Sequence, residues 1–212
     1  WTEAFDKSND VHMGVQRVYE DSKGNVWVFN FGVQYYFPAG SKKYRLVTID
    51  SSKNIIPPDV YLLPVMEKDG NIWCFEGNSG LYGINQETKK IDKFIPVIFN
   101  PLLSAMGAVT IPFLGTDENG TAWITQDYTD TNYIVQFKPG AAVKIRSLPV
   151  NKYGRLKAYI PIGDNHFLFL STAYTAICRS DDFENPLKIL TRENIPGSFI
   201  RNFCYEKLKI YN

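Results

Sequence analysis

The residue types that most often carry out catalysis are sparse in this chain. It has 2 histidines in 212 residues, His12 and His166. A Ser-His-Asp triad needs a histidine in a defined structural context, and the sequence indicates such a context for neither of them. The nucleotide-binding motifs GxGxxG and P-loop are absent, as is any zinc-type spacing of ligands. We therefore predict a segment that is not an enzyme, with no cofactor and no metal site.

Sugar binding is the chemistry that fits one stretch of the chain best. The stretch "QDYTDTN" contains Asp127, Tyr128, Asp130 and Asn132, and Tyr174 has a comparable place in the later stretch "STAYT". An aromatic ring stacks on a sugar, while carboxylate and amide groups form directed hydrogen bonds to its hydroxyls. These five residues are the predicted ligand-binding residues, and an oligosaccharide is the predicted ligand. An ordinary solvated loop is the alternative.

Composition excludes several other classes of partner. Lys and Arg number 23 against 22 Asp and Glu, a formal net charge of +1. Nucleic-acid binding would call for a basic excess or a basic face, so no nucleic-acid partner is predicted. The 3 cysteines, Cys74, Cys178 and Cys204, are odd in number and far apart, and we interpret them as small buried apolar residues.

The uncharged segment 94–115 is long enough to be tested as a membrane span. Its interior contains three prolines and Gly107, which are costly inside a helix. We predict two strands joined by an apolar loop, with no membrane contact. Leu102, Leu103 and Met106 in that loop are then either buried under a neighbouring element or a contact patch for a partner.

A repeat organises the chain around these candidate residues. The stretches "EDSKGNVWVFN", "MEKDGNIWCFEG" and "TDENGTAWITQD" are similar, and "PIGDNHFLFLST" is a weaker copy. Aligning them places Trp27, Trp73, Trp123 and Phe167 in one column, with separations of 46, 50 and 44 residues by subtraction. Periods of roughly 40 to 50 residues with several strands per unit are typical of β-propeller blades.

Each repeat contains four short apolar runs separated by polar turns, and no sustained helical period occurs. We therefore predict an all-β chain, a β-propeller of about four four-stranded antiparallel blades. The blades cover approximately residues 13–50, 58–98, 109–149 and 155–190. The loops between second and third strands lie on the same face as the connections between blades, which places the predicted sugar-binding residues on that face. The aromatic column is expected to pack between blades.

Acidic turns precede the aromatic strands. Asp21, Asp69 and Asp117 are expected to cap hairpin turns in which glycine takes a positive φ. Calcium binding would need several oxygen ligands converging within one loop, and each turn supplies only one or two. We therefore interpret the three carboxylates as turn residues.

The repeats resemble the two-component regulator propeller repeat, whose pattern is an acidic turn, Gly-Asn-aromatic-Trp and then a Gly-Leu-Tyr strand. "EDSKGNVWVFNFGVQYY" and "EKDGNIWCFEGNSGLYGIN" carry this pattern most clearly. The third copy has Thr121 in place of the Asn, and the fourth lacks both the turn Gly and the Trp. The resemblance extends from about Met13 to Leu190.

The resemblance implies an extracytoplasmic, periplasmic or extracellular, sensor region of a hybrid two-component system of the kind common in gut Bacteroidetes, which detects glycans and signals to a kinase. No kinase, receiver or DNA-binding signature occurs in this chain. The alternative is a stand-alone secreted propeller, acting either as a protein-interaction module or as an enzyme similar to streptogramin lyase. The enzyme would need His12 or His166 as its catalytic histidine.

The two ends of the chain are expected to belong to further blades. Residues 1–5, "WTEAF", have the pattern of an outer strand, and residues 200–211 begin with the pattern of an inner strand, "IRNFCYE". We therefore predict a fragment of a larger propeller, whose partners are the remaining blades of a parent chain or a second protomer. A small ring closed by pairing the two ends is the alternative.

Overall fold

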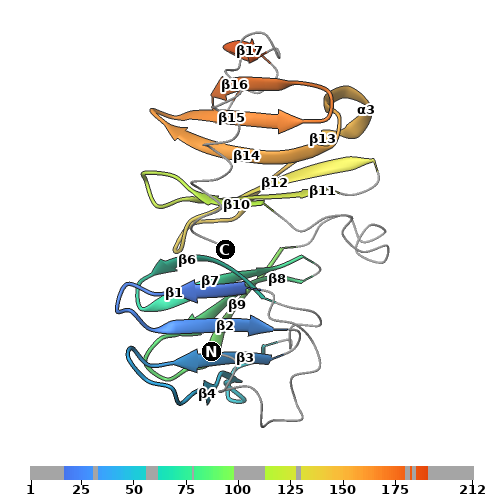
Figure 1. The fold of residues 1–212 in the computed structure, drawn as a ribbon. Helices are drawn as coiled ribbons and strands as arrows, with labels where there is room; N and C mark the ends of the chain where they lie inside the picture. Colours follow the sequence, from blue (N-terminus) through green and yellow to red (C-terminus); the bar gives the residue numbers. More distant parts are fainter. Residues whose placement is uncertain are drawn as a thin grey trace. The chain divides into compact units, whose positions relative to one another are not determined.

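The computed structural model of the chain describes residues 17–30, 33–55, 62–77, 79–97, 113–127, 130–179, 182 and 185–190. These residues form four small sheets (Figure 1). Their helical residues are confined to the single turn α3, Val150–Tyr153. The prediction of an all-β chain is confirmed. The expected strands at 1–5 and 200–211 lie outside the described residues.

The first two sheets are antiparallel meanders. The first contains, in order, β1 (Arg17–Glu20), β2 (Val26–Asn30), β3 (Val33–Phe37) and β4 (Arg45–Leu46). The second contains β6 (Leu63–Lys68), β7 (Asn71–Glu76), β8 (Gly80–Asn85) and β9 (Lys90–Pro96).

A two-residue strand, β5 (Thr48–Ile49), departs from the expected pattern. The run "YRLVTI" was expected to form one outer strand of the first blade. Only β4 pairs with β3, whereas β5 pairs in parallel with β9 of the second sheet, Thr48 opposite Lys90. Val47 lies between the two short strands with its side chain buried, so the outer strand of the first blade passes directly onto the edge of the second.

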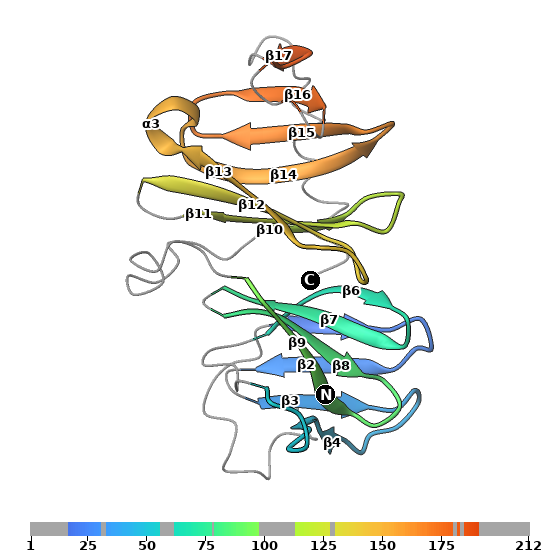
Figure 2. The same ribbon diagram turned by 180° about the vertical axis from the view of Figure 1, so that it is seen from behind.

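The third and fourth sheets follow the same plan (Figure 2). The third contains β10 (Phe113–Thr116), β11 (Ala122–Asp127), β12 (Thr131–Phe137) and β13 (Lys144–Pro149). The fourth contains β14 (Leu156–Gly163), β15 (His166–Ser171), β16 (Thr175–Arg179) and β17 (Lys188–Leu190). The chain therefore has four antiparallel blades of the β-propeller type, as predicted.

The blades group into two compact units. Unit 1 is Trp1–Ile98 and carries the first and second sheets, and unit 2 is Phe99–Ile210 and carries the third and fourth. Each unit has a core between its two sheets. Among the described residues, no helix is long and apolar enough to cross a membrane.

The aromatic column is buried in every blade. Trp27, Trp73, Trp123 and Phe167 have exposed fractions of 0%, 5%, 3% and 1%. In unit 2 the ring centroid of Trp123 lies 4.5 Å from that of Phe167, across the two sheets, in an edge-to-face contact. Such a pair contributes about 0.5–1.5 kcal/mol beyond the area that it buries. The predicted packing between blades is confirmed for this pair.

Two of the hairpin turns hold the indole of their own blade. Asp21 Oδ1 accepts hydrogen bonds from the backbone N–H groups of Lys23 and Asn25, and Oδ2 accepts one from Trp27 Nε1 at 2.9 Å. Asp117 makes the same contact with Trp123 Nε1 at 2.8 Å. An aspartate six residues before the tryptophan therefore both caps the turn and satisfies the buried indole.

The other two turns are built differently. Asp69 and Gly70 have φ of 52° and 71°, and Asp164 and Asn165 have φ of 50° and 60°, values typical of two-residue hairpin turns. The expectation that Asp69 caps its turn as Asp21 does is wrong, because its backbone forms the tight turn itself.

The four turns differ in the residue that stands six positions before the aromatic column, which is an aspartate in the first and third blades only. In the fourth blade Pro161 occupies this position, and the following Phe167 has no N–H that needs an acceptor. In the second blade Glu67 occupies it and binds the neighbouring blade instead. It accepts hydrogen bonds from Ser22 N at 2.7 Å and Ser22 Oγ at 2.6 Å, and Gln86 Nε2 lies 3.0 Å away. The two blades of unit 1 are joined at their turns by this contact.

Two of the cysteines lie in the cores. Cys74 and Cys178 are fully buried and not in disulfides, as predicted. Burial raises the pKa of both thiols, that of Cys178 to about 11. They are therefore unreactive apolar residues at neutral pH. Cys204 lies outside the described residues.

Candidate functional site

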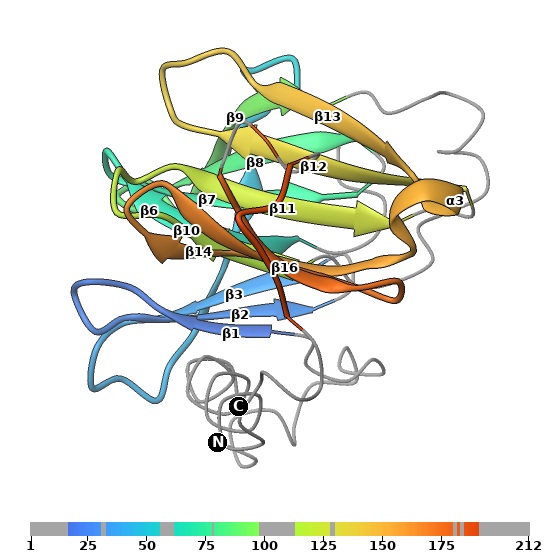
Figure 3. The ribbon, with the colours of Figure 1, turned by 90° about the horizontal axis from the view of Figure 1, so that it is seen from above.

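The predicted binding residues gather at one end of unit 2, which we call the loop end. It comprises residues 127, 130–132, 149–156 and 171–175. Strand β11 runs toward α3 at this end (Figure 3). The backbone N–H of Val150 donates to Asp130 O at 2.9 Å, which joins the β11–β12 loop to the connection between the third and fourth blades. The expected shared face of loops and blade connections is present here.

Asn132 is part of the loop end but is not exposed. Its exposed fraction is 0%. Its Nδ2 donates to Gly154 O at 2.8 Å and to Leu148 O at 3.3 Å, and its Oδ1 accepts from Leu156 N at 2.9 Å. The amide predicted to bind ligand therefore fixes the backbone on both sides of residue 155.

Asp127, another predicted ligand contact, is also buried. Its side chain has no exposed surface, and its Oδ2 lies 3.5 Å from Nη1 of Arg155. A buried carboxylate needs a positive partner to offset its lost hydration. Asp127 thus forms an ion pair with Arg155 and does not itself reach solvent.

Arg155 is the functional candidate that sequence reasoning missed. About a third of its side chain, 34%, is exposed beside the buried carboxylate. Its N–H donates to Thr172 Oγ1 at 2.8 Å, and its carbonyl accepts from Thr172 N at 2.9 Å. Its position in the connection between two blades was the available signal, since such connections share a face with the predicted loop.

Gly154 allows the loops to approach one another at this point. Its φ is +71°, and a Cβ atom there would lie 2.6 Å from Ala173 N and 2.7 Å from Thr172 Oγ1. Only glycine has both the conformation and the space. The close approach of the β15–β16 loop to the blade connection therefore depends on this residue.

Tyr174 is partly buried on the apolar side of the loop end. Its ring stacks on Phe169, with centroids 5.4 Å apart and an interplanar angle of 22°. Partial burial raises the pKa of its phenol, which stays protonated at neutral pH. Ser171 Oγ donates to the carbonyl of Tyr174 at 2.9 Å and holds the loop. Tyr174 is thus a fixed aromatic residue with part of its ring exposed.

Asp130 is the predicted carboxylate that does reach solvent. It accepts a weak hydrogen bond from Thr131 Oγ1 at 3.4 Å. Tyr128, and the predicted partner contacts Leu102, Leu103 and Met106, lie outside the described residues. The loop end therefore presents Asp130, Arg155 and Tyr174, supported from below by the buried Asp127 and Asn132.

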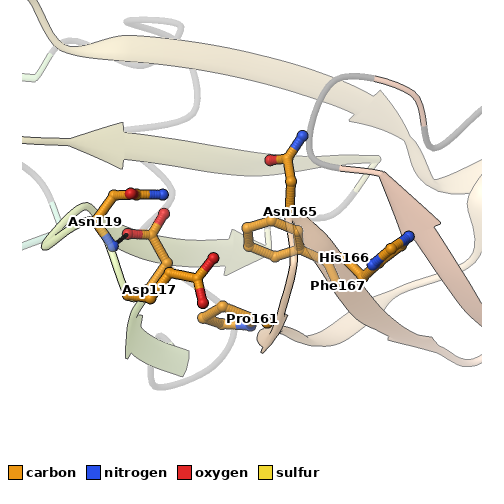
Figure 4. Close-up of a pocket in the computed structure, with 8 residues that line it drawn as sticks. Asp117, Asn119, Pro161, Asn165, His166 and Phe167 are labelled. Carbon is orange, nitrogen blue, oxygen red and sulfur yellow. Dashed lines mark hydrogen bonds between the residues drawn. The ribbon is translucent and has the colours of Figure 1, made fainter.

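The opposite end of unit 2 contains a small hollow between two hairpin turns (Figure 4). It is lined by Asp117, Glu118, Asn119, Pro161, Gly163, Asn165, His166 and Phe167. In the close-up, Asp117 and His166 lie on opposite sides of the Phe167 ring and do not converge. No group of three or more His, Cys, Asp or Glu within the described residues is placed to hold a metal ion. Asp117 is already bound to its own turn and indole.

The class that fold and repeats define is a β-propeller protein. No protein-family model matches the chain, and no curated protein matches it. Among solved structures it is similar to the extracellular domain of the putative hybrid two-component system BT4673 from B. thetaiotaomicron, with a TM-score of 0.55 and 13% identity. That match covers 87% of this chain and 24% of the other.

A second similar structure is described as the extracellular domain of the putative one-component system BT4673 from B. thetaiotaomicron. Its TM-score is 0.49 at 15% identity, covering 80% of this chain and 21% of that one. The chain thus spans about a quarter of the length of the structures that it matches. At these identities the likeness concerns the fold.

Proposed function

We propose that this chain is a non-catalytic, ligand-sensing propeller segment of an extracytoplasmic sensor of a hybrid two-component system. The loop end of unit 2 is the observation that carries the proposal. There, the buried Asp127 and Asn132 hold a partly exposed arginine, and Phe169 and Ser171 hold a partly exposed tyrosine, in fixed positions as binding sites require. The likeness of the fold to the extracellular domain of BT4673 supports the sensor assignment, as does the resemblance of the turns to the two-component regulator propeller repeat.

The proposed ligand is an oligosaccharide. The Tyr174 ring offers an aromatic face for a sugar ring, and Asp130 offers acceptors for hydroxyl groups. Arg155 and the exposed Thr172 add donors and a hydroxyl within the same end of the unit. A periplasmic or extracellular location follows from the sensor assignment, because glycans reach such a sensor from outside the cell.

Binding calorimetry of the whole chain with a panel of plant and host oligosaccharides tests this function. We expect at least one oligosaccharide to bind, and Tyr174→Ala and Asp130→Ala each to weaken it, Tyr174→Ala by about tenfold. Asp164→Ala, an exposed aspartate in the turn at the opposite end, is the matched control and should bind as the wild type does. A bound oligosaccharide that both loop-end variants bind unchanged would refute the assigned location.

The non-catalytic assignment has its own test. The chain is incubated with each oligosaccharide of the panel, with and without divalent metal ions, and the products are separated by chromatography. We expect the oligosaccharides to be recovered intact. Metal-dependent turnover of any of them would instead support the enzyme alternative similar to streptogramin lyase.

A further inference from the structure

We propose that Arg155 is the ligand-contacting group at the centre of the loop end, that Asp127 and Asn132 are its positioning residues, and that the sugar it contacts is uncharged. This inference rests on the proposed function, because it assigns the ligand class of the same site.

The immobilisation of Arg155 is the first support. Asn132 binds the backbone on both sides of Arg155: its Nδ2 donates to Gly154 O at 2.8 Å, and its Oδ1 accepts from Leu156 N at 2.9 Å. The N–H of Arg155 donates to Thr172 Oγ1 at 2.8 Å, and the carbonyl of Arg155 accepts from Thr172 N at 2.9 Å. Asp127 holds the guanidinium from within the core. Backbone and side chain are therefore both fixed before a ligand arrives, which lowers the entropy lost on binding.

The remaining exposure of the side chain is the second support. A guanidinium carries five N–H donors in a planar fork, and a single carboxylate on one side leaves donors for other acceptors. Arg155 Nη1 is buried beside Asp127, while 34% of the side chain is exposed, so we expect the other guanidinium donors to be the ones that meet sugar hydroxyls.

A comparison of the four repeats argues against a purely structural role. Asp127 stands four residues after the aromatic column. The same position holds Phe31, Gly77 and Ser171 in the other three repeats. The blade fold is built without a buried acid there, so the Asp127–Arg155 pair is not a requirement of the architecture. The buried Glu76, one position earlier in the second repeat, accepts hydrogen bonds from Ser79 of its own loop, so a buried acid paired with an arginine of the next blade connection distinguishes the third repeat from the second.

The charge of the loop end selects the ligand class. Its charged side chains are two acidic, Asp127 and Asp130, and two basic, Lys152 and Arg155, so their formal charges sum to zero. Asp127 offsets Arg155 and Lys152 offsets Asp130, so a uronic acid carboxylate would gain no net attraction. An uncharged sugar, whose hydroxyls both donate and accept, fits this balance better.

The experiment compares Arg155→Gln, the double variant Asp127→Asn/Arg155→Gln and the wild type, with Lys157→Gln as a control for the same change of charge at an exposed site on β14. Binding and the thermal unfolding midpoint are both measured. The probes are neutral hexose tetrasaccharides, each paired with the hexuronic acid tetrasaccharide of the same linkage.

We expect Arg155→Gln to lower the midpoint, because it leaves a buried carboxylate without its cation, and to weaken binding of the neutral probe by about tenfold or more. The double variant should recover the midpoint, since an amide pair replaces the ion pair, yet still bind weakly. Lys157→Gln should match the wild type in both measurements.

Two results would overturn the inference while leaving the proposed function standing. If the double variant recovers both the affinity and the thermal unfolding midpoint, Arg155 only stabilises the fold and does not contact the ligand. If the wild type binds uronic acid probes more tightly than their neutral partners, the ligand class is wrong. Binding of no probe of either kind to the wild type would instead overturn the proposed function and this inference with it.

Discussion

Individual carboxylates in this chain do three different tasks. Asp21 and Asp117 complete hairpin turns and hold the indole of their own blade. Glu67, at the equivalent position of the second repeat, joins two blades. Asp127 holds an arginine at the surface. Carboxylates thus support the turn, the contact between blades and the candidate site, and the groups that they contact distinguish the three cases.

The Asp21 carboxylate is expected to contribute measurably to stability. Asp21→Ala leaves the buried Trp27 N–H and two turn N–H groups without their acceptor, which we expect to lower the free energy of unfolding by about 1–3 kcal/mol. Urea unfolding at pH 7 measures the change, with the exposed Glu20→Ala as control. An Asp21→Ala variant as stable as the wild type would contradict the assigned role of the turn contact.

The same contact predicts a pH dependence. Burial acts to raise the pKa of Asp21, but hydrogen bonds from Trp27, Asn25 and the turn backbone outweigh it and hold the pKa below its ordinary value of 3.8. The stability that Asp21 contributes is therefore complete above pH 3.8 and is lost as the pH falls below it, through the folded-state pKa. The difference between wild type and Asp21→Ala should be constant near neutrality and shrink in that acidic range. A difference that grows on acidification would contradict this.

At the residue scale, sequence reasoning selected a loop that does join a blade connection at one end of unit 2, but it did not predict which of its residues are buried. Asp127 and Asn132 were predicted to bind ligand, yet both are buried, and burial is a tertiary property that composition does not reveal. Arg155 was missed because its contacts come from residues up to 28 positions away by subtraction, in two different blades. Polar composition therefore indicated a loop but not which of its side chains are exposed.

Gly154 sets the arrangement of the elements at the loop end. Gly154→Ala would strain a backbone at φ +71° and force a Cβ against Ala173 and Thr172. We expect a loss of about 1–3 kcal/mol in the free energy of unfolding and weaker ligand binding. Gly140→Ala is the matched control, since that glycine has φ +82° with nothing within 4 Å of its added Cβ.

The two variants separate strain from contact. Gly140→Ala should show the cost of the left-handed backbone alone, without an effect on binding. Equal losses of stability in both variants would mean that the close approach of the two loops is unimportant.

Among the elements, periodic patterns predicted the hairpins well. The strand carrying the aromatic column, the turn before it and the strand after it recur because side-chain alternation and glycine turns are local signals. The transfer of β5 to the second sheet was not predictable, since two residues carry no period. The Asp69 turn was misassigned because two residues fewer lie between Asp69 and Trp73 than between Asp21 and Trp27, which changes the turn type.

At the scale of the whole molecule, each unit has a second apolar sheet face. In unit 1 it comprises Val28, Tyr35 and Phe37, with Val26 at its margin. In unit 2 it comprises Ala158, Ile160 and Leu168, with Leu170, Ile177 and Leu190. On the outer strands β4 and β17, Leu46 and Ile189 are 54% and 55% exposed. The main members of both faces are buried, whereas the exposed apolar side chains of the outer strands suit the packing of a further blade.

We therefore expect the chain to associate with further blades or with a second protomer. Size-exclusion chromatography with light scattering should give a mass above that of the monomer, rising with concentration. The variant Leu46→Lys/Ile189→Lys should shift the distribution toward the monomer, whereas Lys42→Glu/Lys157→Glu should not. A monodisperse monomer at all concentrations would contradict this expectation and favour a small closed ring.

The most direct test of the account is hydrogen–deuterium exchange of the whole chain, measured with and without pools of neutral oligosaccharides. If the chain is a glycan-sensing propeller segment, at least one pool should slow exchange in peptides covering residues 127–132, 150–156 and 171–175. Peptides covering the turns at 117–121 and 163–166 should be unchanged. If no pool alters exchange anywhere, or if protection is confined to those turns, the central claim is contradicted.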